Sequence, residues 1–399
     1  MKIMMLCRCF PPKIGGLHKS NYEISKAIND LGYDLNVLVI GRTEKDKKFD
    51  GEEEFSIERT GFKKIKGSVN FFSFFPRVLT TLYSWRKIKK KIKDLGPDKI
   101  IFADDYARML LGIFPVNSLT NSEIITITSV PRTKKMLDST LMTHIRNVII
   151  KKCYRKTDKL VYVSNSTKKE LYNYFGNDLF ADKNEKIIYR TVDDKFIEQD
   201  LDEEEVESII NECGIEKDKK IVLSVSRITK DKGIDKVLKA LKKYKEEGND
   251  DFHYLIVGDG NYLPQIKEMA KDLDLEEHVT STGYIDFDNV IHYYDLCDIF
   301  ILPSRRKISE SFGRVFAEAS ARGKPVIGNN TGGVREVIDH EKTGFLVDPN
   351  KTEKICERIS ELLTENELRK RLGKNGREKV KETFTSEELK EDLQEILKN

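Results

Sequence analysis

Two glutamates stand close together in residues 303–336. Glu310 is expected in a loop after a strand, and Glu318 inside the short helical pattern of residues 313–322. Carboxylate oxygens accept hydrogen bonds from sugar hydroxyls, so the pair suits a hydroxylated ligand. A loop acid beside a solvated helix acid is the other interpretation of the pair alone. The residues around the two glutamates must therefore decide between them.

A glycine-rich turn follows in the same segment. Thr331-Gly332-Gly333 comes after an expected buried strand at residues 325–327 and is expected to open a helix. Free N–H groups at a helix N-terminus attract phosphate. Together with the two glutamates, this turn predicts a site for a polyhydroxylated, anionic ligand.

Two cations occupy a loop earlier in the same half of the chain. Arg227 and Lys232 follow an expected strand at residues 221–225. In open parallel sheets ligands bind beyond the carboxyl ends of the strands, and these two side chains are near enough in sequence to reach one diphosphate. A charged surface loop is the alternative, because lysines are common throughout this chain.

The first strand, expected at residues 2–7, is followed by the loop that contains Gly15 and Gly16 and by a helix at residues 17–31. This is a βαβ start without the G-x-G-x-x-G pattern, so a nicotinamide cofactor is not predicted. The glycines either let a backbone approach a ligand or form a plain tight turn.

Strands alternate with helices in both halves, which predicts an α/β protein with two doubly wound parallel sheets. The acidic residues 193–220 are expected to be irregular and to contain the domain boundary.

The net charge of +3, from 70 basic and 67 acidic residues, predicts no nucleic-acid partner. The six scattered cysteines predict reduced thiols rather than a zinc site or disulfides. MKIMMLCRCF has too short an apolar run for a signal peptide, and no window is long enough for a membrane span, so we expect a cytoplasmic protein.

An aromatic run at residues 71–75 precedes a basic cluster at residues 86–93. Two interpretations remain open: peripheral contact with an anionic membrane surface on the cytoplasmic side, or a solvated helix whose aromatic side chains pack on the sheet.

Four segments, FPPKIGG, SRITKDKG, VGDG and the stretch from Pro303 to Gly333, resemble in order and spacing the retaining glycosyltransferases of family 4 (group 1). The resemblance covers most of the chain. It implies the GT-B fold, with two Rossmann-like domains facing a central cleft. Residues 1–195 would form the acceptor side, residues 196–375 would bind a nucleotide-sugar, and residues 376–399 would return to the first domain.

The resemblance also implies roles for individual residues. The catalytic set would be Glu310, which contacts the transferred sugar, with Arg227 and Lys232, which hold the diphosphate. Glu318 would bind the ribose. The remaining implied donor contacts are backbone groups of Phe312, Gly313, Tyr284 and Ile285, and the implied loop of the first domain contains Gly15, Gly16 and His18.

The implied reaction moves a hexose from a nucleoside-diphosphate sugar, expected to be a UDP-sugar, to a hydroxyl of a glycan or lipid-linked acceptor. Fixed cations and amides would stabilise the charge on the departing phosphate, so we expect neither a metal nor a cofactor. The D-x-D strings at residues 272–274 and 286–288 are interpreted as solvated surface. We favour attack by the acceptor hydroxyl on the same face of the sugar from which the phosphate departs, rather than a covalent sugar intermediate on Glu310.

The chain departs from the family pattern at two places. No histidine stands near residues 124–131, where His18 is the candidate replacement, and Arg190-Thr191 replaces the usual Asn-Gly. Three alternatives therefore stay open: a nucleotide-sugar epimerase, a disaccharide phosphorylase, or a non-catalytic sugar-nucleotide-binding subunit.

Overall fold

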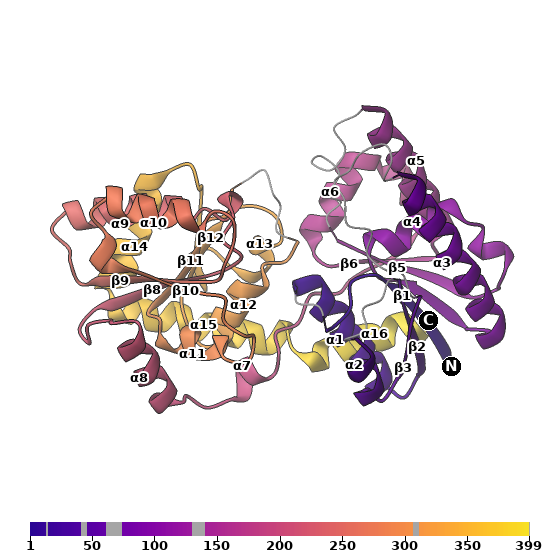
Figure 1. Ribbon diagram of the computed structural model, residues 1–399, viewed down its shortest axis with the longest axis horizontal. Coiled ribbons are helices and arrows are strands. Elements are labelled where there is room, and N and C mark those ends of the chain that lie inside the picture. The colour runs from indigo at the N-terminus through magenta and orange to yellow at the C-terminus, as the bar shows by residue number, and fades with distance from the viewer. Residues whose placement is uncertain (13–14, 41–45, 61–73, 130–139, 306–310, 399) are drawn as a thin grey trace. The chain divides into compact units, whose positions relative to one another are not determined.

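The computed structural model describes residues 1–399 except 13–14, 41–45, 61–73, 130–139, 306–310 and 399 (Figure 1). The chain divides into two compact units. The first contains Met1–Thr191 and Ser386–Asn399, and the second contains Val192–Thr385. Each unit is built on one parallel sheet, as the alternation of strands and helices predicts.

The sheet of the first unit has seven strands in the order β3-β2-β1-β4-β5-β6-β7. The strands are β1 (Lys2–Cys7), β2 (Asp34–Val39), β3 (Ser56–Arg59), β4 (Lys99–Phe102), β5 (Glu123–Thr128), β6 (Lys159–Tyr162) and β7 (Asn184–Ile187). The helices are α1 (Gly16–Asp30), α2 (Asp46–Glu52), α3 (Phe74–Leu95), α4 (Asp105–Ile113), α5 (Thr140–Lys156), α6 (Asn165–Phe175) and the returning α16 (Ser386–Lys398).

The sheet of the second unit has six strands in the order β10-β9-β8-β11-β12-β13. These strands are β8 (Lys220–Val225), β9 (Phe252–Val257), β10 (Val279–Gly283), β11 (Ile299–Leu302), β12 (Val326–Asn329) and β13 (Gly344–Val347). The helices are α7 (Lys195–Glu198), α8 (Glu203–Glu212), α9 (Ile234–Glu246), α10 (Leu263–Asp272), α11 (Val290–Leu296), α12 (Arg314–Ala321), α13 (Val334–Val337), α14 (Thr352–Thr364) and α15 (Asn366–Thr383).

Both sheets contain a topological switch point, where the strand order reverses. In the first unit it lies between β1 and β4, which pair directly, and in the second between β8 and β11. The helices that follow two such strands cover opposite faces of the sheet, so their loops separate beyond the carboxyl ends. The topology thus gives each unit one crevice that suits a ligand.

The domain boundaries differ from the expected ones both where the chain enters the second unit and where it returns to the first. The first unit ends at Thr191 rather than at residue 195, and the returning segment begins at Ser386 rather than at residue 376. Helix α15 accounts for the second difference, because it packs against α12 and stays with the second unit.

Residues 193–220 were expected to be irregular, and this expectation is wrong because they contain α7 and α8. The Asp202 side chain accepts a hydrogen bond from the Glu205 N–H at 3.0 Å and so caps α8. Three of the acidic residues in this stretch, Glu203, Glu204 and Glu205, lie in the first turn of α8, where the helix dipole favours negative charge. Ile209 is buried, so the helix also contributes to the core.

Helix α16 docks on the first unit through an apolar face and a cap. Its buried residues, Leu389, Leu393, Ile396 and Leu397, join the core beneath α1. At its last turn the buried Lys159 ammonium donates to the Ile396 carbonyl at 2.9 Å. A cation there satisfies a free carbonyl and complements the helix dipole.

Lys159 also pairs with Glu123, at 2.8 Å, and Lys99 binds the same carboxylate. Burial alone would raise the pKa of Glu123, but the hydrogen bonds from the two lysines outweigh it and lower the pKa. Because the folded pKa is below the unfolded one, this carboxylate contributes stability above its unfolded pKa. That contribution is lost as the pH falls through the folded pKa.

We predict that Glu123→Gln lowers the free energy of unfolding at neutral pH by about 2 kcal/mol, because two mostly buried ammonium groups lose their counter-ion. The deficit relative to wild type should shrink as the pH falls through the folded pKa of Glu123. Urea denaturation at neutral and acid pH measures both effects, with the exposed Glu276→Gln as control. If the loss in free energy of unfolding were the same at every pH, the charge of Glu123 would not be the source of its stabilising effect.

Candidate functional site

The two predicted cations follow β8, on one side of the switch point in the second unit. Arg227 is exposed, and in the described part of the chain its side chain has no hydrogen bond or ion pair. Lys232 is half-buried at the end of the turn Lys230–Lys232. Gly233 follows with φ 78° and begins α9 without a side-chain cap. Lys232 therefore lies directly before a helix N-terminus, and Arg227 lies in the loop that leads to it.

Glycines hold the neighbouring loops at backbone contact. A Cβ added to Gly233 would lie 2.2 Å from the carbonyl oxygen of Pro303, which follows β11. One added to Gly258, after β9, would lie 1.9 Å from the carbonyl oxygen of Ser226. No side chain fits at either position. These loops could not approach one another as closely with any other residue.

Arg305 links the two sides of the switch point. Its backbone N–H donates to the Asp231 carbonyl at 2.9 Å, and its Nη2 contacts Asp235 Oδ2 at 2.5 Å. Asp235 is buried in the first turn of α9. The chain after β11 is thereby attached to the start of the helix that follows Lys232. Sequence reasoning did not single out this pair, although Arg305 directly follows Ser304 in the recognised segment.

The loop that leads to α12 carries the other expected donor contacts. Glu310 lies outside the described residues. Phe312 is buried, with its ring 5.0 Å from that of Phe384. Gly313 has φ 90° and begins α12 with no side-chain cap. The first amides of α12 are thus not satisfied by a capping side chain.

The glycine-rich turn contacts this loop and opens a helix, as expected, but this helix is short. A Cβ on Gly333 would lie 2.2 Å from the Ser311 carbonyl oxygen and 2.5 Å from the Phe312 Cα. The helix that follows, α13, contains 4 residues. So few aligned peptides produce little dipole, so the expected contribution of this N-terminus to phosphate binding is corrected downward.

Glu318 lies in α12 with a defined internal partner. It is 5% exposed, and its Oε2 accepts a hydrogen bond from the Tyr294 hydroxyl at 2.9 Å. Burial, and then the adjacent Glu318 carboxylate, raise the pKa of Tyr294 well above its usual value. Tyr294 therefore stays protonated and orients one oxygen of the carboxylate. The ring of Phe196 packs edge-on against Tyr294 at 5.8 Å.

Tyr284 and Ile285 follow β10 at the same edge of the sheet. The preceding Gly283 has φ 75°, and its carbonyl accepts from the Gly258 N–H at 2.7 Å. Tyr284 is 53% exposed. The loops after β9 and β10 are therefore joined, with Tyr284 exposed beside them.

In the first unit, Asp104 joins the loops on the two sides of the switch point. Its Oδ2 accepts from the N–H groups of Arg8 at 2.5 Å and Cys9 at 3.0 Å, in the loop after β1. Its Oδ1 accepts from Tyr106 and Ala107, which caps α4. The acid before a helical pattern was available as a cap signal in the sequence. Its contacts with the β1 loop were not predictable.

That loop leads to Gly15, Gly16 and His18. Gly15 caps α1 with φ 150°, and both glycines are exposed. His18 Nδ1 lies 3.0 Å from the Phe10 carbonyl oxygen. A carbonyl only accepts, so Nδ1 carries the hydrogen and Nε2 of the neutral ring keeps its lone pair. The structure thus holds the candidate histidine in one tautomer.

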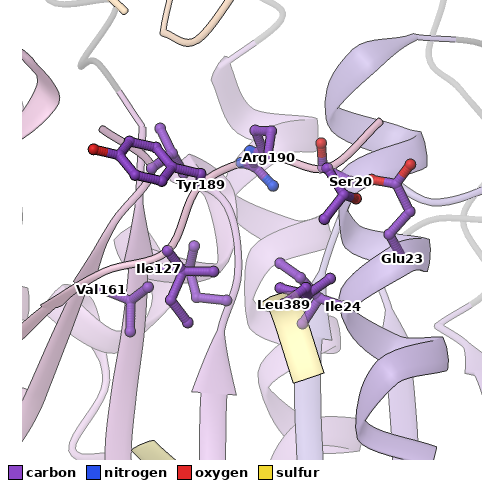
Figure 2. A pocket seen from close by; sticks show the side chains of 11 residues that line it. Ser20, Glu23, Ile24, Ile127, Val161, Tyr189, Arg190 and Leu389 are labelled. Carbon is purple, nitrogen blue, oxygen red and sulfur yellow. The ribbon is translucent and has the colours of Figure 1, made fainter. Parts of the chain in front are cut away.

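Figure 2 shows a pocket of about 290 Å³, including its open mouth, in the first unit. It lies at the carboxyl ends of β5 to β7, beside α1 and α16. The apolar side chains Ile24, Ile127, Val161 and Leu389 lie on one side of it, and the polar side chains Ser20, Glu23, Tyr189 and Arg190 on the other (Figure 2). Arg190 and Thr191, which depart from the family pattern, thus line this pocket.

The D-x-D string at residues 286–288 has a structural partner. Asp288 is exposed and pairs with Lys195 at 2.8 Å. Across the described ranges, no three His, Cys, Asp or Glu side chains are grouped in a way that could hold a metal ion. In the same ranges, no helix is both long and apolar enough to span a bilayer.

We predict that Asp235 and Arg305 are energetically coupled, because separating them leaves a buried carboxylate without its counter-ion. A double-mutant cycle with Asp235→Asn and Arg305→Met should give a coupling of about 2 kcal/mol in the free energy of unfolding. The exposed pair Lys354–Glu357 on α14 is the matched control and should give no measurable coupling, because solvent screens both charges. If the effects of the two single substitutions on the free energy of unfolding simply added in the double variant, the pair would not connect the two loops.

Residues 205–379 match the family model described as Glycosyl transferases group 1. The chain is 24% identical to an uncharacterized glycosyltransferase of Methanocaldococcus jannaschii, over 100% of this chain and 98% of that one. It is 31% identical to the N-acetyl-alpha-D-glucosaminyl L-malate synthase of Bacillus anthracis, over 61% of this chain and 60% of that one. It is 34% identical to a GDP-mannose-dependent alpha-(1-6)-phosphatidylinositol monomannoside mannosyltransferase of Mycobacterium tuberculosis, over 44% of this chain and 47% of that one.

Solved structures resemble the whole chain in fold. Anabaena HepE in complex with UDP and glucose superposes with a TM-score of 0.78 at 17% identity, covering 100% of this chain and 99% of that one. The sucrose-phosphate synthase of Thermosynechococcus elongatus gives 0.80 at 20% identity, covering 100% and 98%.

Proposed function

We propose that this chain, a group 1 glycosyltransferase with the GT-B fold, transfers a hexose from a nucleoside-diphosphate sugar to a hydroxyl of a glycan or a lipid-linked acceptor. The observation that carries the proposal is the pair Arg227 and Lys232 at the carboxyl end of β8, beside the switch point and the uncapped start of α9. Two cations and free amides in such a crevice suit a diphosphate.

In this proposal the cations stabilise the leaving group. Breaking the bond between the sugar and the β-phosphate develops negative charge on the phosphate. Arg227 offers a planar pair of donors and Lys232 a compact charge, and both act more strongly as that charge grows. No redox or covalent cofactor is required.

The other donor contacts are assigned by the same reasoning. Glu310 and the amides of Phe312 and Gly313 would bind the transferred sugar. Glu318, whose Oε2 accepts from the Tyr294 hydroxyl, would bind the ribose hydroxyls. The backbone of Tyr284 and Ile285 would border the base.

The donor is proposed to be a UDP-sugar. Support comes from the fold neighbour solved with UDP and glucose, although the mannosyltransferase relative is named for GDP-mannose. The acceptor is proposed to bind the first unit near Gly15, Gly16 and His18. The relative named for a phosphatidylinositol monomannoside supports an acceptor hydroxyl on a lipid.

We propose retention at the anomeric carbon. The acceptor oxygen forms its bond to that carbon on the face from which the β-phosphate leaves. The departing phosphate oxygen takes the acceptor's proton, so atoms and charge balance without a covalent enzyme intermediate. We further propose that the reaction occurs in the cytoplasm, with the enzyme peripheral to the membrane.

We predict that Arg227→Ala lowers kcat/KM for transfer by about a hundredfold or more, as expected for loss of one donor to a developing anion. Lys230→Ala, in the same loop and exposed, is the matched control and should stay near wild type. Steady-state kinetics with a UDP-sugar would measure both variants. If kcat/KM fell equally in the two variants, or in neither, Arg227 would have no specific role in the reaction.

We also predict that chelation leaves the rate unchanged. Transfer measured in EDTA and in added Mg²⁺ should agree, and the double substitution Asp286→Asn with Asp288→Asn should retain activity. Loss of activity in EDTA that Mg²⁺ restores would contradict the metal-independent mechanism.

A further inference from the structure

Helices α3 and α5 carry an unusual concentration of positive charge. Over Phe74–Leu95 and Thr140–Lys156 the one acidic residue is Asp94, although the net charge of the chain is only +3. The exposed cations, none of which pairs with a carboxylate in the described part of the chain, are Arg86, Lys89, Lys90 and Lys93 on α3 and Lys151, Lys152 and Arg155 on α5.

Both helices also expose large apolar side chains. Leu82 and Tyr83 on α3 are 47% and 44% exposed, and Ile145 and Val148 on α5 are 44% and 40% exposed. On each helix these residues continue into the cations at spacings of three and four, so they form one stripe along one face. Along each stripe the apolar residues come first and the cations follow.

The fold aligns the two stripes. Helices α3, α4 and α5 contribute to one core on the same face of the first sheet, and Trp85 of α3 stacks on Phe114, which follows α4, at 4.5 Å (Figure 1). Each helix returns from the carboxyl edge of a parallel strand to the amino edge of the next. The apolar parts of both stripes therefore lie toward the carboxyl edge, and the cations toward the amino edge.

We infer that the exposed faces of α3 and α5 form a docking surface for an anionic phospholipid bilayer. Leu82, Tyr83, Ile145 and Val148 enter the headgroup region, and the seven cations named above contact lipid phosphates. This combination of apolar side chains and cations is what binds interfacial helices to anionic membranes. An RNA backbone would use the cations but would leave the aliphatic Leu82, Ile145 and Val148 without a partner.

The docking surface adds α5 to the basic cluster of residues 86–93, while residues 71–73 of the aromatic run lie outside the described residues. The apolar end lies at the same edge of the sheet as the Gly15–Gly16 loop. A hydroxyl carried on a membrane lipid would thus approach the first unit from that edge. The binding surface itself does not depend on the transfer reaction.

The test is sedimentation with vesicles of phosphatidylcholine alone, or of phosphatidylcholine mixed with phosphatidylglycerol, without donor or acceptor. Wild type should bind the mixed vesicles, and added salt should weaken the binding. Lys151→Glu with Lys152→Glu should lower the partition coefficient at least about tenfold. The control is Lys267→Glu with Lys271→Glu, at two exposed positions on α10 in the second unit. It makes the same change in net charge and should leave the partition coefficient near that of wild type.

Ile145→Ser with Val148→Ser tests the apolar part, and it should reduce binding while leaving the salt dependence in place. Circular dichroism and transfer kinetics on a soluble acceptor show whether each variant is folded. Equal losses in the α5 and α10 variants would indicate unspecific charge attraction and overturn the inference. Failure of wild type to bind the mixed vesicles would also overturn the inference. So would tight binding to RNA, if Lys151→Glu with Lys152→Glu abolished RNA binding but left vesicle binding unchanged.

Discussion

The contact of Arg305 with Asp231 and Asp235 is the interaction on which the site in the second unit depends. At a switch point, the two central loops lead to helices on opposite faces of the sheet, so nothing in the sheet itself holds them together. Arg305 bridges them with one backbone hydrogen bond and one charged contact. Asp235 is buried, so the charged contact acts with little screening by solvent, and separating the pair is costly. The position of Lys232 relative to the chain after β11 follows from this contact.

In the first unit, a carboxylate rather than an arginine holds the two loops of the switch point together. Asp104 there accepts from backbone N–H groups on both sides of its switch point, rather than from a side-chain cation. These hydrogen bonds fix the backbone before Gly15. Both edges carry an exposed arginine shortly after the strand, Arg8 after β1 and Arg227 after β8. The two units therefore differ in how their central loops are joined, by a buried carboxylate in one and by a charged contact in the other.

Much of the fold could be predicted from the sequence because buried parallel strands are continuous apolar runs. Strand β1 begins and ends at the predicted residues, and β8 begins one residue earlier than predicted. The wrong prediction for residues 193–220 arose because acidic residues favour both a solvated linker and the first turn of a helix. The Asp202 cap and the buried Ile209 distinguish the two.

The site could be predicted in part. The chain pattern was enough to assign Arg227 and Lys232 to the end of a strand, because that position depends on local sequence. The partners of Asp235, Glu318 and Asp104 were not predictable, since each contact joins residues that are far apart in the chain. Likewise, the tautomer of His18 depends on the Phe10 carbonyl, which only the folded loop brings near.

Isothermal titration of nucleotides into the protein in EDTA tests the central claim most directly. The account predicts that one nucleoside diphosphate, expected to be UDP, binds without metal and more tightly than its monophosphate. It predicts that Arg227→Ala removes most of this difference while Lys230→Ala keeps it. Equal affinities for diphosphate and monophosphate in wild type, or no binding of any nucleotide, would contradict the claim that the crevice beside β8 holds a diphosphate.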